Sequence, residues 1–182
     1  IDSVRGVTWD DWRLPRGGPI GATHTTAFSD SGGSDLGYAI TSPSHELAHL
    51  YYVTLGNLGY CAPVGADTVE ECVAQDGAGL VNSGPFLNVG GKSFWTASEW
   101  ESNPQFAWAF NTVSHASTIL PPGATGTGLS QPQLKHLDRW SWAVRDGDVG
   151  AAPVPEPASV SLLLVGLGGA YAARKRGHRR AD

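Results

Sequence analysis

The sequence predicts an α+β domain of short antiparallel strands, one clear helix and long loops. Charged residues make up only 16% of the 182 residues, while 24 Gly and 12 Pro indicate short elements joined by many turns. Apolar residues recur at helical spacing in residues 47–55. Aromatic residues alternate with small or polar ones in residues 94–96, 107–110 and 139–149, which is typical of strands.

The helix is the first regular element that the sequence predicts. It follows Gly21–Ile40, a stretch rich in Gly, Ser, Thr and Asp that we expect to form an irregular loop. Ser42 or Ser44 is suited to cap the helix, with Glu46 in its first turn. Gly56 and the Asn that follows it are suited to end the helix.

The strands are predicted in the second half of the chain. Phe94–Thr96 and Ala107–Phe110 flank a polar loop, as two neighbouring strands would. A last strand is expected in "RWSWAVRDGDV", where Trp140, Trp142 and Val144 share one face. Because aromatic side chains that alternate in this way usually face a core, we expect these tryptophans to be packed inside.

The C-terminal segment differs from the rest of the chain. Pro155-Glu156-Pro157 leads into the uncharged run Ala158–Ala173, and five of the twelve basic residues follow in the last nine positions. The run is slightly short for a bilayer span, but small neighbours and arginines that reach the interface favour a transmembrane helix. We therefore divide the chain into a domain (1–149), a linker (150–157) and a transmembrane sorting tail with a basic end (158–182).

These three features in this order resemble the PEP-CTERM sorting signal of Gram-negative bacteria. The resemblance implies an exported precursor held in the inner membrane by its tail. It also implies recognition by an exosortase and release of the processed protein to the cell surface or beyond. Proteins of this kind are associated with exopolysaccharide and biofilm matrix, so exopolysaccharide is an expected partner.

Two cysteines, Cys61 and Cys72, bracket a loop of ten residues. In an exported protein this pattern favours a disulfide bond. Closing so short a loop contributes about 2–3 kcal/mol to stability. The two cysteines lack the C-x-x-C spacing of a metal site.

Six blocks in the body resemble Lcl C-terminal-like domains, which are named for a collagen-like protein. They are "DWRLP", "HELAHLYYVTLGN", "GLVNSGPF", "FWTASEW", "AWAF" and "WAVRDGDV", in this order. The resemblance implies a C-type-lectin-like fold and no established activity. Such domains carry a strand and a helix ahead of the first block, so we expect this domain to be truncated at its N-terminal end.

The string His45-Glu46-Leu47-Ala48-His49 is a literal H-E-x-x-H, the signature of zinc peptidases. Two His at this spacing bind one zinc ion, and the Glu acts as base on its water. A third ligand is still needed, and the extended motif would place Gly at position 52 and His at 55, where the chain has Tyr52 and Leu55. Glu70 and Glu71 lie near the other usual spacing, but beside Cys72.

We therefore interpret this segment as a structural helix. Lcl C-terminal-like domains usually have Ser at the position of His45, which implies a surface position for that residue. We expect His49 to lie among the packed side chains and Leu50 to be in the core.

The charge of the body excludes one class of function. Residues 1–153 hold seven basic and fifteen acidic side chains, a net charge of −8 that repels phosphate backbones, so we expect no nucleic-acid binding. Asp10, Asp11, Asp146 and Asp148 would suit Ca²⁺, although turn carboxylates exposed to water are commoner.

The sequence thus favours an exported, surface-sorted, non-enzymatic domain without a cofactor or bound metal, acting in the matrix or in adhesion. Two alternatives stay open: a zinc-dependent peptidase that uses His45, Glu46 and His49, and a carbohydrate-binding module that uses exposed Trp.

Overall fold

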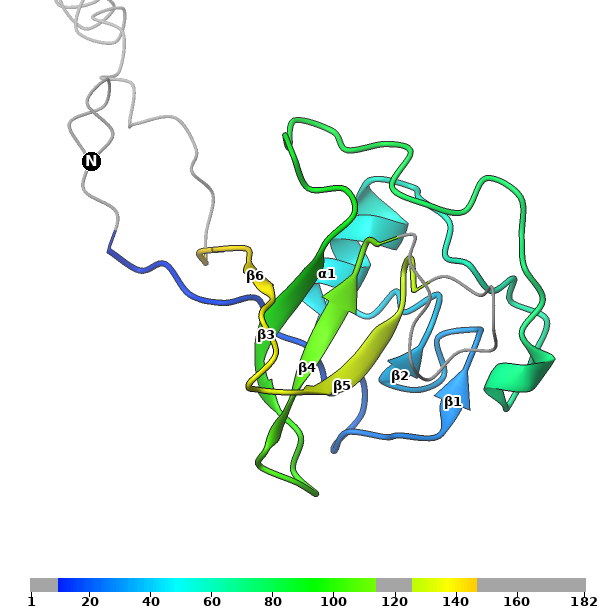
Figure 1. Ribbon diagram of the computed structural model, residues 1–182, viewed down its shortest axis with the longest axis horizontal. Coiled ribbons are helices and arrows are strands. Elements are labelled where there is room, and N and C mark those ends of the chain that lie inside the picture. The colour runs from blue at the N-terminus through cyan, green and yellow to red at the C-terminus, as the bar shows by residue number, and fades with distance from the viewer. Residues whose placement is uncertain (1–9, 114–125, 147–182) are drawn as a thin grey trace, which may run out of the picture. The chain divides into compact units, whose positions relative to one another are not determined.

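A mixed six-stranded sheet forms the centre of the computed structural model, which describes residues 10–113 and 126–146 (Figure 1). The strands lie in the order β1-β2-β5-β4-β3-β6. The pairs β1–β2 and β3–β6 are parallel, and the other neighbours are antiparallel. The strands are β1 (Phe28–Ser29), β2 (Leu36–Gly37), β3 (Ser93–Glu99), β4 (Phe106–Asn111), β5 (Ser130–Leu134) and β6 (Trp140–Ser141). Residues Asp10–Arg145 form one compact unit; the second unit, Ile1–Trp9 with Asp146–Asp182, contributes only Asp146 to the described residues.

The hairpin of β3 and β4 confirms the prediction of two neighbouring antiparallel strands. Phe94 pairs with Phe110 and Trp95 with Ala109, so each partner pair faces the same side of the sheet. The register shifts between Trp95 and Glu99. Both strands extend beyond the predicted ranges, β3 to Ser93–Glu99 and β4 to Phe106–Asn111.

The predicted helix is present but begins later than the serine caps suggested. Helix α1 covers Glu46–His49 and continues as a π-helix, η1, over Leu50–Thr54. The N-cap residue of α1, His45, makes no side-chain cap hydrogen bond, and the hydroxyl of Ser44 instead donates to the carbonyl oxygen of Pro19 at 2.7 Å. The chain leaves the helix at Gly56, whose φ of +66° favours glycine.

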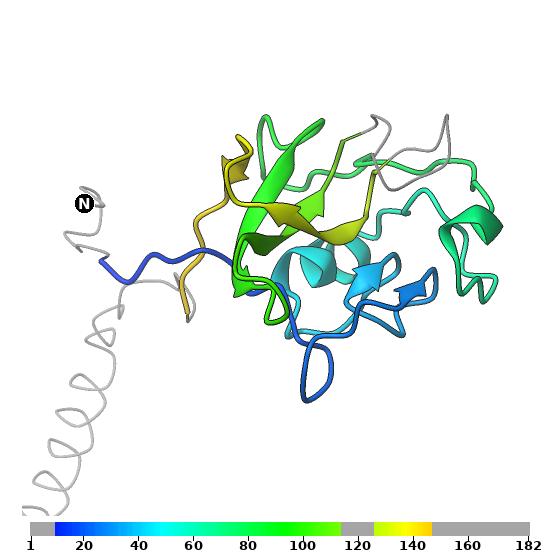
Figure 2. The same cartoon turned by 60° about the horizontal axis from the view of Figure 1, so that its bottom comes forward.

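The core lies between this helical segment and one face of the sheet (Figure 2). Leu47, Ala48 and Tyr51 from the helical segment pack on Phe94 of β3 and Phe110 of β4. Leu50 is only partly buried, so its predicted core position was wrong and Leu47 takes that role. A second cluster lies under β1 and β2 and consists of Phe28, Tyr38, Cys61, Ala66 and Leu129.

The last strand is much shorter than predicted. β6 comprises only Trp140 and Ser141, and Val144 forms an isolated antiparallel bridge with Arg13. Trp142 packs against Phe94, with ring centroids 5.2 Å apart, whereas Trp140 keeps 57% of its surface exposed. The core position predicted for Trp140 was therefore wrong.

The sheet with one short helical segment is compatible with the predicted α+β class. Within residues 10–113 and 126–146, no helix has the length and apolar character needed to cross a membrane. The predicted transmembrane helix over Ala158–Ala173 lies outside the described residues. So do the linker and residues 147–149 of the predicted last strand.

Candidate functional site

The first side chain of the H-E-x-x-H string, His45, is fully buried, so the surface position predicted for it was wrong. Its Nε2 lies 2.7 Å from the hydroxyl oxygen of Ser130 on β5, and its ring meets Phe110 edge-on. In the described part of the chain, Nδ1 has no hydrogen-bond partner. Burial lowers the pKa of His45 to about 4, although the nearby carboxylate of Asp35 acts in the opposite direction. His45 is therefore a neutral core histidine at pH 7.

The carboxylate of Glu46 is held by an arginine on the other side of the helix start. Its two oxygens accept one hydrogen bond each from Nη1 and Nη2 of Arg13, both at 2.7 Å. The backbone N–H of Arg16 donates a third bond at 2.6 Å. The hydrogen bonds from Arg13 lower the pKa of Glu46, despite its partial burial. Such a carboxylate is committed to an ion pair and is a poor general base.

The side chain of His49 contacts neither the partner of His45 nor that of Glu46. Its Nδ1 lies 2.7 Å from the carbonyl oxygen of Thr41, and the residue is partly exposed rather than packed in the core as predicted. Glu70 and Glu71 lie exposed on a single 3-10 turn, η2 (Val69–Glu71). Among the residues that the structure describes, no three His, Cys, Asp or Glu side chains are grouped to hold a metal ion.

The string does not act as one site because α1 starts one residue too late. A shared face for the two His requires both to lie within regular helix. His45 precedes the first turn with a φ of −105° and a ψ of 81°, so its side chain is directed into the sheet. The geometry thus separates the three side chains that the motif would bring together.

The acidic pairs Asp10/Asp11 and Asp146/Asp148, at the two ends of the body, are not arranged as calcium ligands among the described residues. A carboxylate oxygen of Asp11 lies 3.1 Å from Nε of Arg145, which neutralises a charge that Ca²⁺ would need. Asp10 and Asp146 are exposed, and Asp148 lies outside the described residues.

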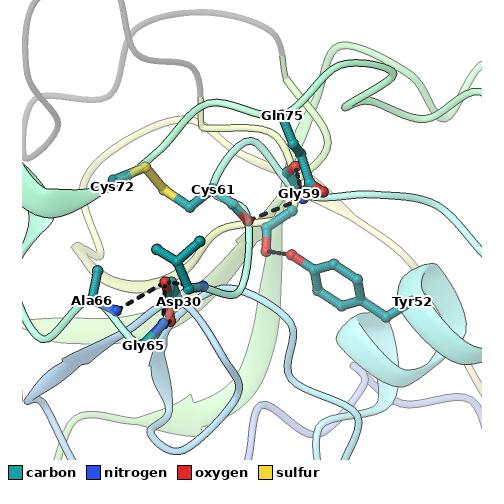
Figure 3. The surroundings of a disulfide bond; sticks show 10 residues. Asp30, Tyr52, Gly59, Cys61, Gly65, Ala66, Cys72 and Gln75 are labelled. Atoms are coloured by element: carbon teal, nitrogen blue, oxygen red, sulfur yellow. Dashed lines mark hydrogen bonds between the residues drawn. A yellow bond between two sulfur atoms is a disulfide. The ribbon is translucent and has the colours of Figure 1, made fainter.

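The predicted disulfide between Cys61 and Cys72 is present, with Cα atoms 5.3 Å apart (Figure 3). It closes a loop that folds over Asp30, which is fully buried at the end of β1. The carboxylate of Asp30 accepts hydrogen bonds from three successive backbone N–H groups of this loop, Val64, Gly65 and Ala66, at 2.8–3.1 Å. The amide of Gln75 holds the base of the loop by donating to the carbonyls of Gly59 and Cys61.

The loop is an anchor rather than a reactive site. Burial tends to raise the pKa of Asp30, but the three backbone N–H donors outweigh it and lower the pKa below its usual value. The carboxylate is therefore ionised at pH 7 and fully occupied by the loop. Its role is to fix residues 61–72 to the sheet.

An open concave surface lies beside β6 at one edge of the sheet. We call it the Trp140 groove; it has a volume of about 550 Å³, within the range of known ligand sites. Its lining includes an aromatic cluster in which the ring of Trp142 contacts those of Phe86 and Phe94, with centroids 4.9 and 5.2 Å away. Leu87, which is 84% exposed, and Trp140, which is 57% exposed, also line the groove.

One cation lies in this groove. The ammonium of Lys92 sits 3.5 Å from the centroid of the Trp140 ring, a cation–π contact. No carboxylate lines the groove, and Lys92 forms no ion pair with any described residue. Asn88 and Ser141 add polar side chains that likewise have no hydrogen-bond partner in the described ranges.

Sequence reasoning missed the groove as a site. Exposed tryptophan was recognised as a possible sugar platform, but the alternation around Trp140 and Trp142 assigned both to the core. The usable signal was the run from Pro85 to Val89, where three apolar residues follow a proline in a loop. A loop of that composition has to pack on something, and here it packs on Trp142.

Comparison with known proteins identifies the tail. The chain matches the PEP-CTERM protein-sorting motif over residues 153–176, which include the predicted motif residues Pro155, Glu156 and Pro157. No curated protein and no solved structure matches the chain. The protein is thus an exported, membrane-anchored precursor that is sorted to the cell surface. The sorting motif that it carries is the PEP-CTERM type, which an exosortase processes.

Proposed function

We propose that this protein is a non-enzymatic surface domain that acts in the extracellular matrix or in adhesion after its tail is removed. The observation that carries this proposal is the sorting motif at residues 153–176. A motif that delivers a domain to the surface favours a role outside the cell. The acidic domain, fastened by a disulfide, suits that oxidising setting.

The geometry of the body supports a binding role over catalysis. His45, Glu46 and His49 each have a different partner, namely Ser130, Arg13 and Thr41. The Trp140 groove instead combines exposed aromatic surface with the polar side chains of Lys92, Asn88 and Ser141. Such a surface can hold a ligand but offers no nucleophile and base in contact with each other.

A cell-fractionation experiment tests the sorting part of the proposal. An epitope within the body is followed in membrane, surface and medium fractions for the parent chain and for a chain lacking Val154–Asp182. We expect the parent to pass through an inner-membrane form and the truncated chain to be released without one. A full-length parent that fractionates as soluble without any processing would refute the sorting role.

A matched variant separates the motif from simple anchoring. Replacing Pro155, Glu156 and Pro157 by alanine leaves the apolar run and the basic end unchanged. We expect this variant to accumulate in the inner membrane uncut, because anchoring by apolar residues is kept while exosortase recognition is lost. Normal surface delivery of this variant would count against exosortase as the partner.

We also propose that the body has a C-type-lectin-like fold. It is supported by the six sequence blocks, which fall on the N-terminal segment, α1, the loop before β3, β3, β4 and β6 in that order. An experimental structure of the full chain that superposes on a C-type lectin domain would establish it, and a different strand order would exclude it.

A further inference from the structure

We propose that the Trp140 groove binds a glycan that bears isolated carboxylates, such as a polymer in which neutral sugars alternate with uronic acids. Glycan binding is a property separate from surface sorting, because the purified protein can be tested for it outside the cell. It rests on three features of the groove: an aromatic platform, an uncompensated cation and the acidic surroundings.

The Lys92 ammonium covers one face of the Trp140 ring, so in this proposal the apolar face of a pyranose stacks on the part of the ring that stays exposed. Trp140 is 57% exposed, although it belongs to a strand, and Leu87, which also lines the groove, is 84% exposed. Trp142 and Phe86, whose rings contact each other, add further aromatic surface to the lining. Large apolar side chains around a concavity mark a binding surface, and an amphipathic ring can bury the platform while its hydroxyls stay wet.

The polar groups around the platform match the hydroxyls of a sugar. Asn88 provides an amide and Ser141 a hydroxyl at the rim, and both are exposed. Neither has a hydrogen-bond partner among the described residues, so a ligand can use them without breaking an existing bond. A purely apolar peptide or lipid segment would leave these groups unsatisfied.

The cation gives the groove its preference for a carboxylate. The other lysine of the described ranges, Lys135, is paired with Glu99, and Arg13 and Arg145 are paired with Glu46 and Asp11. Among residues 10–113 and 126–146, the ammonium of Lys92 contacts only the Trp140 ring, and the residues that line the groove include no acidic side chain. A carboxylate next to a stacked sugar ring would therefore meet an ammonium that is already held in place.

The surroundings limit how much negative charge the ligand can carry. Residues 10–146 contain six basic and thirteen acidic side chains, so their net charge is −7. A densely sulfated chain would gain one contact at Lys92 but would be repelled by the rest of the surface. The groove is thus suited to a sparsely charged glycan rather than to any polyanion.

Isothermal titration calorimetry on the full chain in detergent micelles tests this specificity with three defined probes. They are a hyaluronan hexasaccharide with one carboxylate per disaccharide, neutral cellohexaose and a heparin hexasaccharide. We expect hyaluronan to bind about tenfold more tightly than cellohexaose, and heparin to bind more weakly than hyaluronan. The hyaluronan affinity should fall with added salt, because it includes one ion pair.

Two variants locate the binding and two matched variants control for composition. Trp140→Ala should weaken both hyaluronan and cellohexaose by about tenfold or more, since it removes the shared platform. Lys92→Gln should reduce hyaluronan to the level of cellohexaose and leave cellohexaose unchanged. Two control variants, Trp12→Ala and Lys135→Gln, should leave the affinity for both sugars unchanged. Trp12 is 52% exposed, and both residues lie outside the groove. Melting temperatures confirm that each variant is folded.

The outcomes separate the parts of the inference. If Trp140→Ala binds hyaluronan like the parent, or if no sugar binds, the groove is not a glycan site. If Lys92→Gln weakens cellohexaose and hyaluronan equally, or if heparin binds best, the preference for isolated carboxylates is wrong. Binding of a hexaglutamate peptide in place of the sugars would identify an acidic-peptide site and overturn the inference. None of these results bears on sorting, which is measured in cells.

Discussion

His45 and Glu46 are neighbours in the sequence, yet their side chains lie in opposite environments. His45 is buried against Phe110 and Ser130, whereas Glu46 is held near the surface by Arg13. Burial without a full set of partners keeps the imidazole neutral, and the guanidinium keeps the carboxylate charged. The same two residues that spell a zinc motif are therefore used to fasten α1 to the sheet and to the N-terminal segment.

The depressed pKa of His45 makes stability depend on pH. The unfolded chain binds a proton at this residue below about pH 6.5, and the folded chain does so only below about 4. Stability is therefore complete above pH 6.5 and decreases as the pH falls through this window. Between pH 7 and 4.5 we expect the free energy of unfolding to fall by about 2 kcal/mol on this account.

Urea denaturation at several pH values measures this effect. The decrease in the free energy of unfolding between pH 7 and 4.5 should be clearly smaller in His45→Gln, which lacks the buried imidazole. An equal decrease in the parent and in His45→Gln would show that other groups cause the acid sensitivity.

Asp30 fixes the disulfide loop through its carboxylate. Asp30→Ala leaves three backbone N–H groups of the loop, including that of the buried Ala66, without their acceptor, so we expect a loss of about 3 kcal/mol in the free energy of unfolding. Asp76→Ala, at an exposed carboxylate, should change it by no more than about 0.5 kcal/mol. Denaturant midpoints measure both; similar values for the two variants would contradict the anchoring role.

At the scale of elements, the pattern of apolar residues predicted the central hairpin and the helix but not their ends. The alternation around Phe94 and Phe110 identified β3 and β4, because both strands place these residues on the covered face. The helix start was misplaced, because Ser44 found a partner in Pro19, far away in the sequence. A serine hydroxyl can bond to a backbone group far away in the sequence instead of capping the helix, and the local sequence pattern does not reveal such a partner.

The helical segment contributes to stability through the side chains that it presents to the sheet. Leu47 is buried on Phe94 and Phe110, so Leu47→Ala should cost about 2–5 kcal/mol. Val53→Ala, at a residue of the same segment that is 49% exposed, should cost no more than about 0.5 kcal/mol. Thermal and urea unfolding compare the two; a large loss in Val53→Ala alone would mean that the helix packs through another face.

At the scale of the whole molecule, the sequence indicated the tail and the disulfide well, because each is a local feature. The partners of His45 and of Asp30 lie 85 and 34–36 residues away, and no spacing rule connects them. The Trp140 groove was missed for the same reason. Its two sides come from residues 85–92 and 140–143, which only the parallel pairing of β3 and β6 brings together.

We expect residues 153–176 to act as a sorting signal that is processed on a surface domain. The most direct test is the intact mass of the protein recovered from the surface fraction of its own cells, with and without exosortase activity. We expect the surface form to have lost the segment C-terminal to the Pro155-Glu156-Pro157 motif, and the uncut precursor to accumulate in the inner membrane when exosortase is absent. A surface form that retains Asp182 in both strains would contradict this claim.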